Sequence, residues 1–173
     1  MWTIGAWAAA EAIVLPVVPD VGLCLLVLAA PRWTLRLFLG VVAGALLGTL
    51  LLAALSTVSP RGVESMLLGL PGIDAAMLAD ADAAVADRGI GAFAQFGPGA
   101  PLKVYTDAWM GHGGDAAGLL VGAVLNRLTR IGPAILVAAV LGWRLGGWIR
   151  SRERPLLAAY AAFWILVYSV YLA

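Results

Sequence analysis

Apolar segments separated by short polar turns make up most of the chain. The run 37–58 carries no charged residue, and it is long enough to cross a bilayer, which takes about 20 helical residues. Its glycines, spaced four residues apart from position 40 to position 48, share one helix face and predict close contact with another helix. In 115–149 we expect one long transmembrane helix, kinked at Pro133, which lacks a backbone donor. The stretch 155–173 predicts a last transmembrane helix.

Two further apolar segments, 1–31 and 90–111, are interrupted near their centres. Each arm is too short to span a bilayer, so we expect two re-entrant helical hairpins. Non-helical backbone at that depth is tolerated only inside protein or beside a water-filled cavity. The residues that break the two segments are Pro16, Pro19, Pro98, Gly99 and Pro101.

The remaining segment, 60–88, is the most polar part of the chain, and its aspartates predict an acidic helical segment outside the bilayer. The positive-inside rule places the basic turns around 32–36 and 150–154 on the cytoplasmic side. The two hairpins then enter from opposite faces, a layout that recurs in transporters. The pattern therefore predicts an all-α integral membrane protein, one membrane domain over 1–173. It has about three transmembrane helices, two opposed re-entrant hairpins and one amphipathic or soluble acidic helix.

Composition agrees with a membrane class. Hydrophobic residues make up 62% of the chain and charged residues 12%, against about 45–50% and about 25% in soluble domains. The formal net charge of +1 gives no reason to expect a nucleic-acid partner. Metal-ligand spacing and a Gly-x-Ser-x-Gly nucleophile motif are both missing from the sequence. We therefore expect no metal, no cofactor and no enzymatic activity.

Six charged residues nevertheless fall within the apolar segments, where each charge costs about 2.5–3.5 kcal/mol on insertion scales. Two flank the first interruption, two flank the second, and two lie in the long apolar segment that follows. These residues are Glu11, Asp20, Lys103, Asp107, Arg127 and Arg130.

The six charges allow two interpretations. In the first, they form ion pairs that hold the helices together; Glu11 or Asp20 can pair with either arginine, and Asp107 with Lys103 four residues earlier. In the second, they line a polar cavity between the hairpins. There the carboxylates gain and lose protons, while two guanidinium groups on one helix face bind a phosphate.

Three motifs resemble those of the DedA / VTT-domain family, also called the SNARE-associated Golgi protein family. Glu11-x4-Pro16-x2-Pro19-Asp20 is similar to its first re-entrant loop. Phe93-Ala-Gln-Phe-Gly-Pro-Gly-Ala-Pro-Leu-Lys103 resembles the second loop, an aromatic-x-Arg-aromatic-x-Pro-Gly segment, and its Pro-x-Lys ending resembles the YqaA-like branch. Asn126-Arg127-Leu-Thr-Arg130 resembles the basic pair of the helix that follows. The likeness covers most of 11–146.

The second loop departs from the family pattern. Gln95 stands where the family usually has arginine, and Pro101 and Lys103 stand where many members carry another arginine. Either Lys103 replaces that charge, or this branch handles a different headgroup.

The resemblance implies a multi-pass protein of the bacterial cytoplasmic (inner) membrane that moves lipids between leaflets. The implied substrates are undecaprenyl phosphate or phospholipids, with protons coupled to transport in some members. We expect a flippase- or scramblase-like translocase, compatible with a homo-oligomer. Headgroup binding is assigned to Arg127, Arg130 and Lys103, proton coupling to Glu11 and Asp20, and supporting roles to Asp107, Gln95 and Asn126. The alternatives are a proton-coupled small-ion or drug transporter, and a membrane scaffold without transport.

Overall fold

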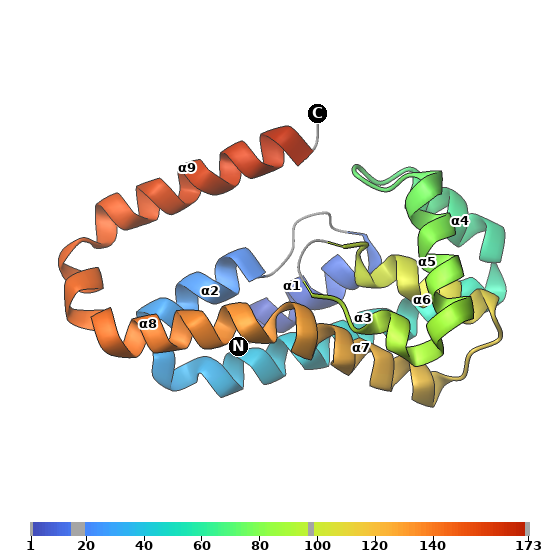
Figure 1. Cartoon of the computed structure of the whole chain (residues 1–173), viewed down its shortest axis with the longest axis horizontal. Helices are drawn as coiled ribbons and strands as arrows, with labels where there is room; N and C mark the ends of the chain where they lie inside the picture. Colours follow the sequence, from blue (N-terminus) through green and yellow to red (C-terminus); the bar gives the residue numbers. More distant parts are fainter. Residues whose placement is uncertain (1, 15–19, 97–98, 172–173) are drawn as a thin grey trace.

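Helix α3 (Thr34–Val58) is the longest element of the fold, and the first part of the chain packs against it. The computed structural model describes residues 2–14, 20–96 and 99–171, and over these ranges the chain is helical without any strand (Figure 1). The other elements, in chain order, are α1 (Trp2–Ile13), α2 (Asp20–Ala29), the 3-10 helix η1 (Pro31–Trp33), α4 (Pro60–Leu68), α5 (Ala75–Arg88), the 3-10 helix η2 (Gly89–Phe93), α6 (Leu102–Gly111), α7 (Ala116–Arg130), α8 (Gly132–Ser151) and α9 (Glu153–Tyr171).

Helix α1 packs closely along α3 because glycines line the contact. A Cβ atom at Gly44 would overlap with the carbonyl oxygen of Gly5, and one at Gly48 would overlap with that of Ala9. The close helix contact predicted from the glycine spacing is confirmed at these positions. Gly48 lies near the middle of α3, so the residues of α1 that follow Ala9 lie at mid-height of the longest helix.

Helix α2 packs mainly along α8, and it also contacts the Trp7 side chain of α1 through Gly22. A Cβ atom at Gly142 would come within 2.7 Å of the Leu28 carbonyl oxygen, so the two backbones lie close together. Leu23 and Val27 of α2 share a buried apolar cluster with Ile135 of α8. The two arms of segment 1–31 therefore rest on different helices.

The polar segment 60–88 holds two helices, α4 and α5, rather than one continuous helix. The chain turns between them at Gly72, whose φ of 75° is in the left-handed region that favours glycine. Asp74 then caps α5 by accepting a hydrogen bond from the Met77 backbone N–H at 2.7 Å. Figure 1 shows α4 and α5 at the end of the molecule where α3 ends.

Segment 90–111 contains one α-helical arm, α6. Its other arm is the short 3-10 helix η2, followed by non-helical backbone before Pro101. Phe93 at the end of η2 is fully buried, and its ring lies 5.8 Å from that of Tyr105 and 6.1 Å from that of Trp109. The aromatic contacts therefore hold the end of η2 against α6.

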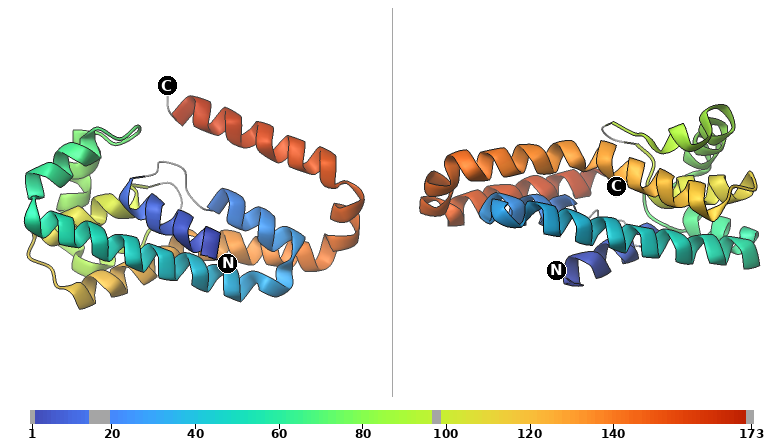
Figure 2. Two further views of the ribbon diagram at one scale, coloured as in Figure 1. Left: turned by 180° about the vertical axis from the view of Figure 1, so that it is seen from behind. Right: turned by 90° about the horizontal axis from the view of Figure 1, so that it is seen from below.

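The segment predicted as one kinked helix, 115–149, is two helices, α7 and α8, which follow one another along the same long axis (Figures 1 and 2). The break falls at Ile131, two residues before the expected kink. Pro133 lies in the first turn of α8, where its missing N–H group costs no helical hydrogen bond. Because Pro133 has no N–H group, it cannot donate to the carbonyl of Thr129, and the hydrogen bonds of α7 do not continue into α8 at this position.

Two helical stretches in the described ranges are long and apolar enough to cross a membrane, Pro31–Val58 and Gly132–Ile149. In α9 the apolar stretch is shorter, Arg154–Val167. Figure 1 shows α9 diverging from the other helices after the turn that joins it to α8. Large apolar side chains on it remain exposed, for example Ile165 and Leu166.

The two basic turns lie at the same end of the molecule. The 3-10 helix η1, which carries Arg32, contacts α8, and α8 leads directly into the turn that carries Arg152. The acidic helix α5 lies at the opposite end (Figure 1).

Candidate functional site

The centre of the candidate site is an ion pair between Glu11 of α1 and Arg127 of α7. An Nη atom of Arg127 donates to a carboxylate oxygen of Glu11, and neither side chain is more than 3% exposed. Glu11 follows the point where α1 crosses Gly48 of α3, so the pair lies near the middle of that helix. Two opposite charges are thus brought together in the interior by helices that lie far apart in the sequence.

Lys103 joins the same cluster from α6. Its Nζ atom donates a hydrogen bond to the backbone carbonyl oxygen of Glu11 at 3.2 Å, and the residue is 2% exposed. Lys103 lies in the first turn of α6, directly after Pro101. The first arm of segment 1–31, the helical arm of segment 90–111 and the last turn of α7 therefore meet at these three side chains.

The last turn of α7 also binds the non-helical stretch of segment 90–111. Asn126 donates to the carbonyl oxygen of Phe93 at 3.1 Å, and the hydroxyl of Thr129 accepts from the backbone N–H of Gln95 at 3.1 Å. Arg130 donates through Nη1 to the carbonyl oxygen of Ala100 at 3.2 Å. The backbone groups of Phe93, Gln95 and Ala100 therefore have hydrogen-bond partners in α7. Non-helical backbone away from water requires such partners.

Several buried polar atoms beside this turn have no hydrogen-bond partner among the described residues. They are Nε of Arg127, Oδ1 of Asn126, and both side-chain amide atoms of Gln95. Buried polar atoms are normally hydrogen-bonded, so these atoms are exceptions among the described residues. Gly99 packs directly against the Gln95 amide, and a Cβ atom at this glycine would overlap with it.

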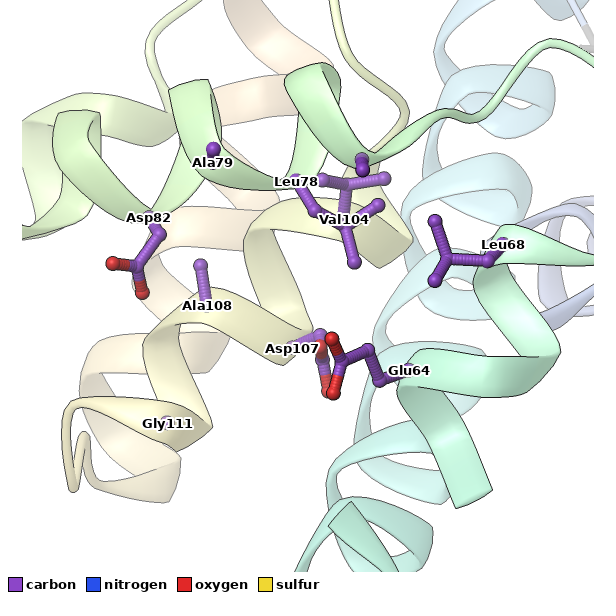
Figure 3. A pocket seen from close by; sticks show the side chains of 10 residues that line it. Glu64, Leu68, Leu78, Ala79, Asp82, Val104, Asp107, Ala108 and Gly111 are labelled. Carbon is purple, nitrogen blue, oxygen red and sulfur yellow. The ribbon is translucent and has the colours of Figure 1, made fainter. Parts of the chain in front are cut away.

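Asp107 lies away from the ion pair, on the part of α6 that leads towards α4. Ser56 donates a hydrogen bond to it at 3.3 Å, whereas Lys103 binds Glu11, so the expected pairing of Lys103 with Asp107 is replaced by different partners. Asp107 lines a pocket of about 380 Å³ together with Glu64 and Asp82 (Figure 3). This pocket is separate from the cluster around Glu11.

Some of the expected site residues lie wholly or partly outside the described structure. Asp20 is the first residue of α2, but its side chain is not described. The described residues also do not include the loop-breaking prolines Pro16, Pro19 and Pro98.

Sequence reasoning missed Thr129 and Ser56. Thr129 lies three residues after Asn126, on the same helix face as a residue already singled out, so its place in the site could have been found from spacing. Ser56 belongs to an uncharged run, and its contact with Asp107 spans 51 positions. No local pattern signals that contact.

The chain matches no protein-family model, no curated protein and no solved structure. The resemblance to the DedA / VTT-domain family therefore rests on the three motifs around Glu11, Gln95 and Arg127 alone.

Proposed function

We propose that this chain is a multi-pass membrane protein that moves an anionic lipid headgroup, such as undecaprenyl phosphate or a phospholipid, between leaflets. The observation that carries the proposal is the buried Glu11–Arg127 pair, set where the two interrupted segments meet. Charged groups at membrane depth are rare, and they commonly mark substrate or proton pathways.

The distribution of apolar and charged side chains supports a membrane setting. Large apolar residues are exposed along both long apolar helices, among them Leu35 at 67%, Leu136 at 65% and Trp143 at 70%. Soluble proteins rarely expose contiguous apolar surface on this scale. The basic turns share one end of the molecule, as the positive-inside rule requires of cytoplasmic turns.

In the proposed mechanism, a proton replaces Arg127 at Glu11, and a phosphate replaces Glu11 at Arg127. Protonation of Glu11 removes the charge that holds the Arg127 guanidinium, which then binds the headgroup phosphate with two parallel hydrogen bonds. Loss of the proton lets Glu11 bind Arg127 again and displaces the headgroup. Uptake of a proton and binding of an anionic headgroup are therefore linked at one pair of side chains.

Neighbouring residues complete the headgroup site. Arg130 uses Nη1 for the Ala100 carbonyl, which leaves further N–H groups of its five-donor guanidinium for a phosphate. Lys103 adds a second cation beside Glu11. Gln95 Nε2 and Arg127 Nε offer N–H donors that have no partner among the described residues. Asp20 is proposed as a second proton-binding carboxylate, on the resemblance of the first motif alone.

A structural role for the ion pair is the competing proposal, and the closed contact between Glu11 and Arg127 favours it. Buried ion pairs can often be replaced by neutral groups without loss of stability, so a structural pair should be replaceable without loss of transport. A small-ion transporter would need Glu11 but neither arginine.

Lipid transfer in vesicles separates these proposals. The protein is reconstituted into liposomes that carry labelled undecaprenyl phosphate or labelled phospholipid in one leaflet, with and without a pH gradient. We expect wild-type protein to transfer lipid faster when a proton gradient is imposed. The neutral double variant Glu11→Gln/Arg127→Met and the single variant Arg130→Ala should lose transfer, while Arg144→Ala, at an exposed position of α8, should keep it.

Folding of each variant is checked by gel filtration and circular dichroism before transfer is measured. Full transfer by a folded Glu11→Gln/Arg127→Met protein would assign the pair a structural role. Transfer of a small cation that survives loss of both arginines but not of Glu11 would favour the small-ion transporter.

A further inference from the structure

An apolar groove is lined by α1, by Trp33 of η1 and by the first half of α3. Its volume is about 820 Å³. Its lining includes small residues such as Ala6 and Ala43, together with the larger Leu39 and Leu47. The groove does not include Glu11, Lys103 or Arg127.

One end of the groove carries a positive charge held by an aromatic ring. The guanidinium of Arg36 lies over the Trp33 ring, 4.8 Å from its centre, and both residues line the groove. A cation over a tryptophan face is attracted by the ring and loses some of its mobility. This end is also the end of the molecule that carries the basic turns.

The length of the groove matches one leaflet of a bilayer. At about 1.5 Å per helical residue, α3 rises roughly 17 Å between Arg36 and Leu47. Half of the hydrocarbon core of a bilayer is roughly 15 Å. A hydrocarbon chain lying in the groove with its headgroup at Arg36 would therefore end near the middle of the membrane.

We propose that this groove binds one hydrocarbon chain of an anionic lipid of the cytoplasmic leaflet, with the lipid phosphate on Arg36. The inference rests on the proposed membrane placement, but it concerns a site distinct from the Glu11–Arg127 pair. The apolar walls fit the chain, the Arg36 guanidinium fits the phosphate, and Trp33 lies where interfacial aromatics are enriched.

The charge at Arg36 favours a lipid over a second copy of the protein as the occupant. Two copies with the same membrane orientation, packed on this face about a two-fold axis, would bring the same patch of each together. Their Arg36 residues would then lie at the same depth in one interface, with like charges in proximity. An anionic lipid instead supplies the opposite charge.

Fluorescence quenching by lipids with brominated chains tests the proposal. The protein is placed in phosphatidylcholine bilayers in which a fixed fraction is brominated phosphatidylglycerol or brominated phosphatidylcholine. The signal of Trp33 is obtained by subtracting the quenching of a Trp33→Phe variant. We expect the phosphatidylglycerol to bind about fivefold more strongly at Trp33 than the phosphatidylcholine.

Two matched pairs of variants locate the site. Arg36→Gln should abolish the preference for the anionic lipid, whereas Arg32→Gln, on the same turn but outside the groove, should leave it unchanged. Ala43→Leu fills the groove and should reduce quenching by both lipids, whereas Ala54→Leu, exposed on α3 and not part of the groove, should not.

Equal quenching by the two lipids in the wild-type protein would overturn the proposal. A dimer that dissociates in the Ala43→Leu variant, with no lipid preference, would assign the groove to a second copy instead. The Glu11→Gln/Arg127→Met protein should keep the lipid preference even though it loses transfer. The lipid preference at Trp33 therefore tests the groove site, and lipid transfer tests the proposed transport site, so the failure of one can be told from the failure of the other.

Discussion

The guanidinium of Arg127 lies against the carboxylate of Glu11, a residue 116 positions earlier in the chain. Both side chains are buried, so each charge depends on the other for the interactions that water would otherwise supply. The pair also joins α1 to α7, two helices that otherwise pack mainly on α3 and its neighbours.

Removing one member of this pair should destabilise the protein more than removing both charges. Arg127→Met leaves the Glu11 carboxylate buried without its cation, and we expect a loss of about 3–5 kcal/mol in the free energy of unfolding. The double variant Glu11→Gln/Arg127→Met should recover most of that loss. Unfolding by sodium dodecyl sulfate in mixed micelles measures both values. A double variant no more stable than Arg127→Met would contradict this account of the pair.

The contact between α1 and α3 should not tolerate a methyl group at Gly44. Gly44→Ala places a Cβ atom on the carbonyl oxygen of Gly5, which belongs to the backbone and cannot rotate away. We expect destabilisation of about 1–3 kcal/mol, as for other overpacked sites. Gly147→Ala is the control, because a Cβ atom there meets nothing within 4 Å, and it should be neutral or slightly stabilising. Thermal unfolding in detergent compares the two.

The Gln95 amide should contribute to lipid transfer rather than to stability. Its two polar atoms are buried without partners among the described residues, so Gln95→Met removes unsatisfied groups that cost about 1–3 kcal/mol. We expect unchanged or higher thermal stability together with slower lipid transfer in vesicles. A clear loss of stability would show that a protein group satisfies the amide.

The Thr129 hydroxyl should hold the non-helical backbone at Gln95 in place. Thr129→Val keeps the shape of the side chain but removes the acceptor of the Gln95 backbone N–H. We expect faster hydrogen exchange at that amide, measured by mass spectrometry, and a loss of about 1 kcal/mol in stability.

Thr57→Val is the matched control for this prediction. Thr57 is exposed, and its hydroxyl donates only to the carbonyl oxygen of Ala54 within its own helix. Exchange at Gln95 that stayed unchanged in Thr129→Val, or that rose equally in Thr57→Val, would argue against the hydrogen bond as the cause.

Local patterns in the sequence predict the helices better than they predict the breaks. The uncharged run 37–58 lies within α3, because length and hydropathy suffice to define such a helix. The polarity of 60–88 predicts one helical stretch, although Pro71-Gly72 signals the turn that divides it. Pro133 predicts a kink at its own position, but proline is accepted in the first turn of a helix, so the break precedes it.

The sequence predicts which residues form the site, but it does not predict which of them contact one another. The cost of burying a charge in an apolar segment singles out Glu11, Lys103 and Arg127 without any knowledge of the fold. The sequence allows Glu11 to pair with either Arg127 or Arg130. The structure selects Arg127 because the packing of α1 and α7 decides which carboxylate reaches which guanidinium. Contacts across 92 or 116 positions have no counterpart in helical periodicity.

The different packing of the two arms of segment 1–31 gives the fold a mechanical property. Helix α1 is fastened to α3 by backbone-to-backbone contact at Gly44, whereas α2 is fastened to α8 at Gly142. The two arms also meet in one buried apolar cluster, where Ile4 and Ala8 of α1 lie with Leu23 and Val27 of α2. Together they link α3 to α8, so moving these two helices apart would require this cluster to break.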